Sequence, residues 1–128
     1  MEYVTLHNQL KMPILGLGVF QVPDKKECQE TVYQAIKNGY RLIDTAASYM
    51  NEGAVGKAVK QAIEEGICTR EELFITSKLR VQDMRTYEIA KQGINNSLKK
   101  SGLEYFDLYL LHQAMGDYFA AWLSLIHI

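Results

Sequence analysis

Apolar residues occur along this chain in short runs and, between the runs, at helical spacing. Residues 3–14 predict a β-hairpin, because two short strands flank a polar turn near Asn8 and Gln9. The apolar run 15–20 predicts a further strand, whose glycines allow another backbone or a ligand to approach closely. Gly16 and Gly18 do not form a classical dinucleotide-binding motif, since Gln21 stands where the third glycine is needed.

Three helices are predicted farther along, each with a recognisable start and stop. The start signals are Asp24 (with Glu27 as an acidic capping box), Asn51 and Thr86, and the stops are Gly39, Gly66 and Gly102. The side chains expected to be buried are Cys28, Val32, Ala35 and Ile36 in the first helix, Val55, Ala58, Val59 and Ala62 in the second, and Ala90, Ile94 and Leu98 in the third.

Strands are predicted before and between these helices, at residues 41–44, 72–78 and 105–112. Strict alternation of strand and helix implies a parallel sheet with right-handed crossovers. A strand spacing of about thirty residues is typical of a (β/α)₈ barrel, which needs about 250 residues. With 128 residues, the pattern leaves two α/β folds open, a small open sheet or the first half of a barrel.

The end of the chain breaks the helical pattern. A fourth helix is predicted to begin after Asp117, but residues 123–128 supply neither a polar face nor a stop signal. We therefore expect a break in the natural sequence after Trp122, with residues 123–128 as a non-native tail.

The composition narrows the possible partners. The formal net charge of −1 gives no electrostatic reason to expect nucleic acid or an anionic membrane surface. No charged N-terminal segment precedes a long apolar run, so we expect no signal peptide and no membrane span. Cys28 and Cys68 lack metal-site spacing and are expected to be reduced thiols of a cytoplasmic protein.

Polar side chains recur where the predicted strands end. Asp44, Lys78 and His112 close three strands, and Tyr49 lies in the loop after the first of them. Each of these residues alone has an ordinary structural explanation, such as a turn acceptor, a solvated charge or partly buried packing. Because the carboxyl ends of parallel strands meet at one rim, the four side chains are expected to converge in one pocket.

These four groups suit acid–base chemistry at a carbonyl. A phenol has a reference pKa of about 10, and a nearby ammonium favours its ionised form, while a carboxylate keeps the ammonium in place. An imidazole can orient a carbonyl oxygen by hydrogen bonding. No metal-ligand spacing accompanies the set, so no metal site is expected.

Four stretches of the chain resemble the aldo-keto reductase family: M-P-I-L-G-L-G, G-Y-R-L-I-D-T-A-A-S-Y-M-N-E, R-E-E-L-F-I-T-S-K-L and S-G-L-E-Y-F-D-L-Y-L-L-H-Q. The residues H-Q-A-M-G-D-Y-F, at the end of this region, are most similar to those of bacterial members that resemble diketogluconate reductases. The resemblance implies the N-terminal half of a (β/α)₈ TIM barrel, preceded and plugged by the hairpin. It also implies NADPH-dependent reduction of aldehydes and ketones to alcohols, with a small carbonyl compound as the substrate.

The resemblance also implies roles for particular residues. The catalytic tetrad of the family falls on Asp44, Tyr49, Lys78 and His112, with Tyr49 as the proton donor. Cofactor contacts are implied for Gly18, Val19, Phe20 and Asp44, and substrate contacts for Phe20, Tyr49 and His112. Two departures are Val19, where many members have threonine, and Arg80, where an aromatic residue usually stands.

The 128 residues correspond to an incomplete domain, because most of the family's cofactor-gripping residues lie on later strands. We therefore expect the chain alone to be inactive as a reductase, although full-length members are often monomers. Two alternatives remain open: a non-catalytic relative that binds a cofactor or partner, and a half-barrel that pairs with a copy of itself through its exposed sheet edges.

Overall fold

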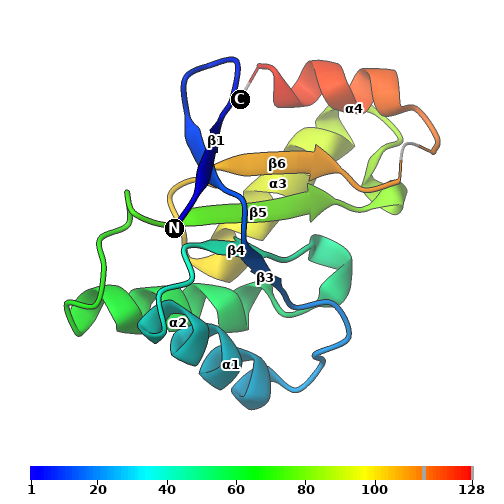
Figure 1. Ribbon diagram of the computed structural model, residues 1–128. Helices are drawn as coiled ribbons and strands as arrows, with labels where there is room; N and C mark the ends of the chain where they lie inside the picture. Colours follow the sequence, from blue (N-terminus) through cyan, green and yellow to red (C-terminus); the bar gives the residue numbers. More distant parts are fainter. Residues whose placement is uncertain (114, 128) are drawn as a thin grey trace.

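A four-stranded parallel sheet and a separate hairpin organise the chain (Figure 1). The computed structural model describes residues 1–113 and 115–127. The hairpin pairs β1 (Tyr3–Thr5) with β2 (Lys11–Pro13), as predicted. The sheet has the order β3 (Gly16–Gly18), β4 (Leu42–Asp44), β5 (Phe74–Leu79) and β6 (Leu108–Leu111). The predicted parallel pairing is therefore confirmed, and the observed strands are shorter than the predicted apolar runs.

Helices α1 (Lys25–Lys37), α2 (Glu52–Glu64), α3 (Tyr87–Ser101) and α4 (Tyr118–Leu125) alternate with the strands. Asp24 accepts hydrogen bonds from the backbone N–H groups of Lys26 and Glu27, and Thr86 accepts one from that of Ile89. Such bonds satisfy N–H groups that have no partner inside the helix. The predicted cap at Asp24 and the predicted helix start at Thr86 are thus confirmed.

The helices cover one face of the sheet, the face that carries Ile43, Ile75 and Leu79. Ile43 and Ile75 are fully buried among apolar residues of α1 and α2, whereas Leu79 packs with residues of α3 and α4. Residues two positions apart share a face, so Asp44 and Lys78 project from the other face. On that face the inner strands are covered and the edge strand is not: Thr76 of β5 is 3% exposed, and Leu110 of β6 is 39% exposed.

Helix α3 packs through smaller side chains than the sequence predicted. Its buried residues are Ala90, Gly93, Ser97 and Ser101, whereas Ile94 and Leu98 are only partly buried. The close approach of neighbouring elements explains the correction. A Cβ on Gly93 would lie 2.5 Å from Leu79 Cδ1, and one on Gly56 of α2 would overlap the Ser101 backbone.

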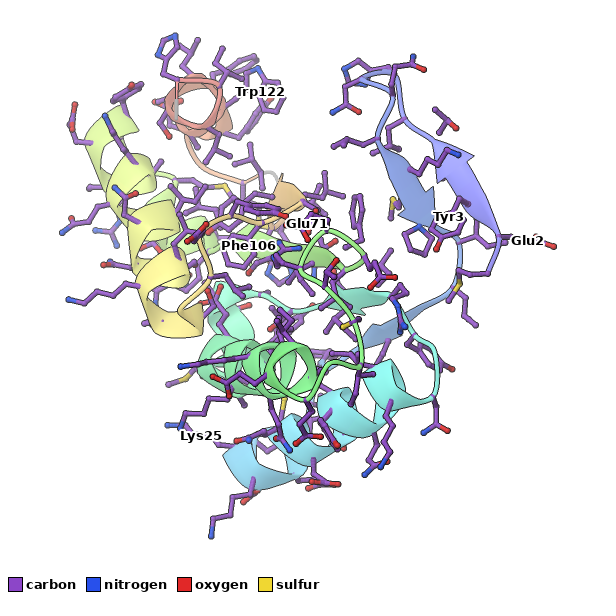
Figure 2. All side chains as sticks on the ribbon, turned by 90° about the vertical axis from the view of Figure 1, so that its left-hand side faces the viewer. Glu2, Tyr3, Lys25, Glu71, Phe106 and Trp122 are labelled. Atoms are coloured by element: carbon purple, nitrogen blue, oxygen red, sulfur yellow. The ribbon has the colours of Figure 1, made fainter. Side chains whose placement is uncertain are left out.

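The hairpin lies beside the N-terminal ends of the strands, across the sheet from helices α1 to α3 (Figure 2). Tyr3 and Lys11 of the hairpin line a hollow together with Arg41, Phe74 and Asp107, which stand at the starts of β4, β5 and β6. The opposite end of the sheet, where the strands finish, is therefore left free of the hairpin.

Asn51 starts α2, but its side chain does not cap the helix as expected. Its amide nitrogen instead donates to the carbonyl oxygens of Val19 (2.9 Å) and Val22 (3.2 Å), and its oxygen accepts from Thr45 Oγ1 at 2.7 Å. This buried side chain thus joins the loop after β3 to the loop after β4. Sequence reasoning identified the position correctly and the hydrogen-bond partners wrongly.

Helix α4 continues through Leu125 and does not stop at Trp122. Its Ala121 and Ser124 are buried, while Phe119, Trp122 and Leu123 are exposed. The expected break in the natural sequence after Trp122 is not tested by the helix bounds and stays a prediction, and Ile128 lies outside the described residues. Within residues 1–113 and 115–127, no helix is both long and apolar enough to cross a membrane.

Replacing Asn51 by Ala is expected to lower the free energy of unfolding by about 2–4 kcal/mol, since buried polar partners lose their hydrogen bonds. Asn51→Asp is the matched variant, because it retains an acceptor for Thr45 but loses both donors to the loop after β3. Urea unfolding followed by circular dichroism measures both. A loss below about 0.5 kcal/mol for Asn51→Ala, the size typical of surface changes, would contradict this role.

Candidate active site

Asp44 and Lys78 meet at the C-terminal ends of two adjacent strands. Lys78 Nζ lies 2.7 Å from Asp44 Oδ2 and 2.8 Å from the backbone oxygen of Thr45. The register pairs Thr76 of β5 with Asp44 of β4, so Lys78 lies two residues beyond the partner of Asp44. Its side chain extends toward β4 to contact the Asp44 carboxylate. The side chain of Lys78 is 13% exposed and that of Asp44 32% exposed. The ion pair is thus partly shielded from water.

Tyr49 brings its phenol to the same ammonium. It ends the 3₁₀ turn η1 (Ala47–Tyr49), which follows β4. Its hydroxyl oxygen is 3.4 Å from Lys78 Nζ, and the ammonium lies 4.9 Å from the centre of the tyrosine ring. A lysine ammonium has three N–H donors, and Asp44, Thr45 and Tyr49 each present one acceptor to it.

His112 follows β6 and contacts the same tyrosine. Its ring stands almost perpendicular to that of Tyr49, at 82° with 5.6 Å between ring centres. Its Nδ1 lies 3.1 Å from Ser48 Oγ. Sequence reasoning missed Ser48, since a single serine in a loop has no distinctive spacing. Its one signal is its position next to Tyr49.

The loop after β3 supplies the other side of the site. The Phe20 ring is 5.0 Å from that of Tyr49 and the residue is 63% exposed. Val19 is 0% exposed, and its N–H and C=O are already bonded to Asp44 and Asn51. The Val19 side chain thus belongs to the core, and a contact between Val19 and a cofactor stays a prediction. Gly18 borders open space, with nothing within 4 Å of an added Cβ.

A cavity of about 490 Å³ opens beside these residues. Its lining comprises Phe20, Ser48, Tyr49, Arg80, Val81, Gln82, His112 and Gln113. The volume lies within the range of small-molecule sites. Arg80 forms a two-pronged ion pair with Asp83, at 2.8 and 3.0 Å, and Asp83 holds the pKa of the guanidinium above its usual value. A fixed cation thus stands in a wall where an aromatic residue was expected by resemblance.

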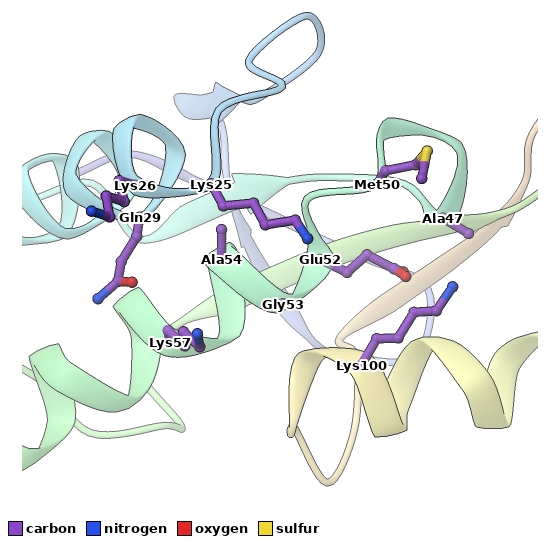
Figure 3. Close-up of a pocket in the computed structure, with 10 residues that line it drawn as sticks. All are labelled: Lys25, Lys26, Gln29, Ala47, Met50, Glu52, Gly53, Ala54, Lys57 and Lys100. Atoms are coloured by element: carbon purple, nitrogen blue, oxygen red, sulfur yellow. The ribbon is translucent and has the colours of Figure 1, made fainter.

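A second hollow of about 480 Å³ lies on the helical side of the sheet (Figure 3). Four lysines line it: Lys25 and Lys26 of α1, Lys57 of α2 and Lys100 of α3. The rest of the lining consists of Gln29, Ala47, Met50, Glu52, Gly53 and Ala54. The Glu52 carboxylate in its wall accepts a hydrogen bond from Ser77 Oγ at 2.6 Å. None of the sequence-predicted site residues lines this hollow, so the rim at Tyr49 is the better candidate site.

The structure thus brings Asp44, Tyr49 and Lys78 into direct contact and places His112 and Phe20 beside Tyr49. Among the residues described, no three His, Cys, Asp or Glu side chains are grouped to hold a metal ion. The arrangement offers a phenol with an adjacent cation, an imidazole and an open cavity. Such a set can donate a proton to an oxygen atom and hold that atom by hydrogen bonding.

Solved structures share this fold closely. A Bombyx mori aldo-keto reductase in complex with NADP superposes with a TM-score of 0.91 at 35% identity, over 98% of this chain and 46% of that one. MGS-M4, an aldo-keto reductase enzyme from a deep-sea metagenome library, superposes with a TM-score of 0.89 at 38% identity, over 98% of this chain and 44% of that one. The four parallel strands therefore form half of a (β/α)₈ barrel, as expected, and the small open sheet is excluded.

Curated proteins with similar sequences are oxidoreductases. The chain is 49% identical over 122 residues to an uncharacterized oxidoreductase, YtbE, of Bacillus subtilis. The aligned residues make up 94% of this chain and 43% of that protein. It is 50% identical over 111 residues to the glyoxal reductase of the same organism, over 87% of this chain and 38% of that protein. The NADPH-dependent aldose reductase GRE3 of Saccharomyces cerevisiae is 44% identical over 109 residues, 85% of this chain and 33% of that protein.

The chain spans less than half the length of these relatives. The model of the aldo/keto reductase family matches residues 14–119, which include the four polar residues of the candidate site. Members of this family are oxidoreductases that act on small carbonyl compounds. The match covers most of the chain, and this protein therefore belongs to the aldo/keto reductase family.

Proposed function

We propose that this chain supplies the acid–base residues of an oxidoreductase that reduces aldehydes and ketones to alcohols with NADPH. The observation that carries the proposal is the position of Lys78 Nζ between Asp44 Oδ2 and the Tyr49 hydroxyl, at 2.7 and 3.4 Å. A phenol beside a cation that is itself held by a carboxylate can donate its proton to a substrate oxygen while the cation stabilises the phenolate that remains. The yeast relative is an NADPH-dependent aldose reductase, which agrees with this activity.

The residues of the rim fit the nicotinamide end of the cofactor. Open space above Gly18 and the exposed ring of Phe20 leave room for a planar ring beside Tyr49. The cations of the rim are already engaged, Lys78 by Asp44 and Arg80 by Asp83. We therefore expect the cofactor phosphates to bind away from this rim, on later strands of the barrel, as the family resemblance implies. The Bombyx mori relative was solved in complex with NADP, which supports the choice of cofactor.

In the proposed reaction, NADPH supplies the hydride that reaches the carbonyl carbon. Tyr49 donates its hydroxyl proton to the carbonyl oxygen, and the Lys78 ammonium stabilises the phenolate that remains. Asp44 and the Thr45 carbonyl hold the ammonium in place. His112 holds the carbonyl oxygen by a hydrogen bond from its ring, and Phe20 and Arg80 border the bound substrate. The same steps in reverse oxidise an alcohol.

Changing Tyr49 to Phe removes only the proton-donating hydroxyl. In the full-length protein, in which this chain continues through the second half of the barrel, we expect carbonyl reduction to fall by about 10²–10⁴-fold. NADPH affinity should stay close to that of the unchanged enzyme. Steady-state kinetics and NADPH fluorescence titration measure the two effects. Substantial turnover by this variant at neutral pH would remove Tyr49 from the role of acid.

Restoring an aromatic residue at position 80 tests the wall of the cavity. Arg80→Trp replaces a cation paired with Asp83 by a flat apolar surface, so we expect KM for bulky substrates to change more than kcat. Arg80→Lys is the control, since it keeps the charge and loses the two-pronged geometry. A large drop in kcat at constant KM for the tryptophan variant would show that this position acts on the chemistry.

The isolated 128-residue polypeptide is not expected to be a reductase. Strands β3 and β6 each pair on one side only within the described residues, and unpaired strand edges promote association. Leu110 is exposed on the face that the remaining strands of a barrel would cover. We expect light scattering to report self-association and NADPH titration to report no binding. A monodisperse monomer that binds NADPH at about micromolar concentration, the range of a typical enzyme substrate, would contradict both expectations.

A further inference from the structure

We infer that Ser48 is a positioning residue that fixes the tautomer of His112. Its Oγ lies 3.1 Å from His112 Nδ1, across 64 residues of sequence. The catalytic consequence rests on the proposed function, but the hydrogen bond and the tautomer do not. The inference concerns which ring nitrogen carries the proton when the imidazole is neutral.

Both residues are anchored by their backbones, so the contact is built into the fold. The turn that carries Ser48 is closed by a bond from Tyr49 N to Ala46 O at 3.0 Å. The backbone N–H of His112 donates to the carbonyl oxygen of Leu79 at 3.0 Å, which extends the pairing of β6 with β5. The His112 ring also rests edge-on against Tyr49. Ser and His side chains are short, so the fixed backbone positions of Ser48 and His112 largely determine this contact.

The hydroxyl of Ser48 can donate to Nδ1 or accept from it, and we assign the donating arrangement. A neutral imidazole carries one N–H and one free lone pair. When the Ser48 hydroxyl donates to Nδ1, the ring proton resides on Nε2, on the side of the ring away from Ser48. Nε2–H can then donate to a carbonyl oxygen in the cavity that His112 lines. The opposite tautomer would present a lone pair to that oxygen and repel it.

No other side chain of the described residues forms a hydrogen bond with this ring. The polar side chains that share the cavity are Tyr49, Arg80, Gln82 and Gln113, and Arg80 is held by Asp83. Ser48 is therefore the side chain of the described residues that contacts a ring nitrogen of His112, and we assign it the donor role because that arrangement leaves Nε2–H for the cavity. Loss of its hydroxyl leaves the two tautomers free to interconvert.

Nitrogen NMR tests this assignment in the full-length protein labelled with ¹⁵N-histidine. The His112 signals are assigned by their absence in His112→Gln, and spectra are taken about 1.5 pH units above the usual histidine pKa of about 6.5. We expect Nδ1 to resonate as an unprotonated nitrogen and Nε2 as a protonated one. Ser48→Val should move both signals toward the average of the two tautomers, and Ser48→Thr, which keeps a hydroxyl in the same volume, should restore them.

Kinetics provide the second readout. We expect kcat/KM for Ser48→Val to fall roughly three- to tenfold, the effect of one neutral hydrogen bond, and Ser48→Thr to recover most of the loss. Unchanged ¹⁵N shifts in Ser48→Val, or a protonated Nδ1 in the unchanged protein, would overturn the inference. An active Tyr49→Phe variant would overturn the proposed function alone, since the tautomer measurement requires no turnover.

Discussion

The ion pair between Lys78 and Asp44 holds the rim of the sheet together. All three donors of the Lys78 ammonium have an acceptor, on Asp44, Thr45 and Tyr49. Removing one partner of a buried ion pair costs about 3–5 kcal/mol, and the cost here should be smaller because Asp44 is 32% exposed. Without Asp44, the 13%-exposed ammonium would lose its counter-ion, and the position of the Tyr49 hydroxyl would no longer be fixed.

Two buried side chains, Asn51 and Glu52, hold the loops of this rim by hydrogen bonds. Asn51 joins the loop that carries Phe20 to the loop that carries Tyr49, through bonds to Val19, Val22 and Thr45. Glu52, the next residue, fixes the start of α2 to β5 through Ser77, one residue before Lys78. The loops around the cavity are thus attached to the core by side chains that do not line the cavity. Their geometry explains how residues from three strand–loop units meet to within a few ångströms.

Much of this could be predicted from the sequence, because the relevant signals are local. The apolar runs and helix caps gave the order of elements, and the strand ends gave Asp44, Lys78 and His112. The resemblance added the choice of a half-barrel over an open sheet. The hydrogen bonds of Asn51 and Ser48 could not be foreseen, since their partners lie up to 64 residues away. The buried face of α3 was mispredicted because Gly93 and Ser97 mark close packing, which hydrophobicity does not report.

A double-mutant cycle on Asp44 and Lys78 tests the central claim most directly. If the ion pair acts as one unit, Asp44→Asn and Lys78→Met should each reduce kcat/KM of the full-length enzyme nearly as much as the two changes together. The coupling free energy should then exceed about 1 kcal/mol, as for residues in direct contact. Additive losses, with coupling below about 0.3 kcal/mol, would show that the two groups act independently and would contradict this account.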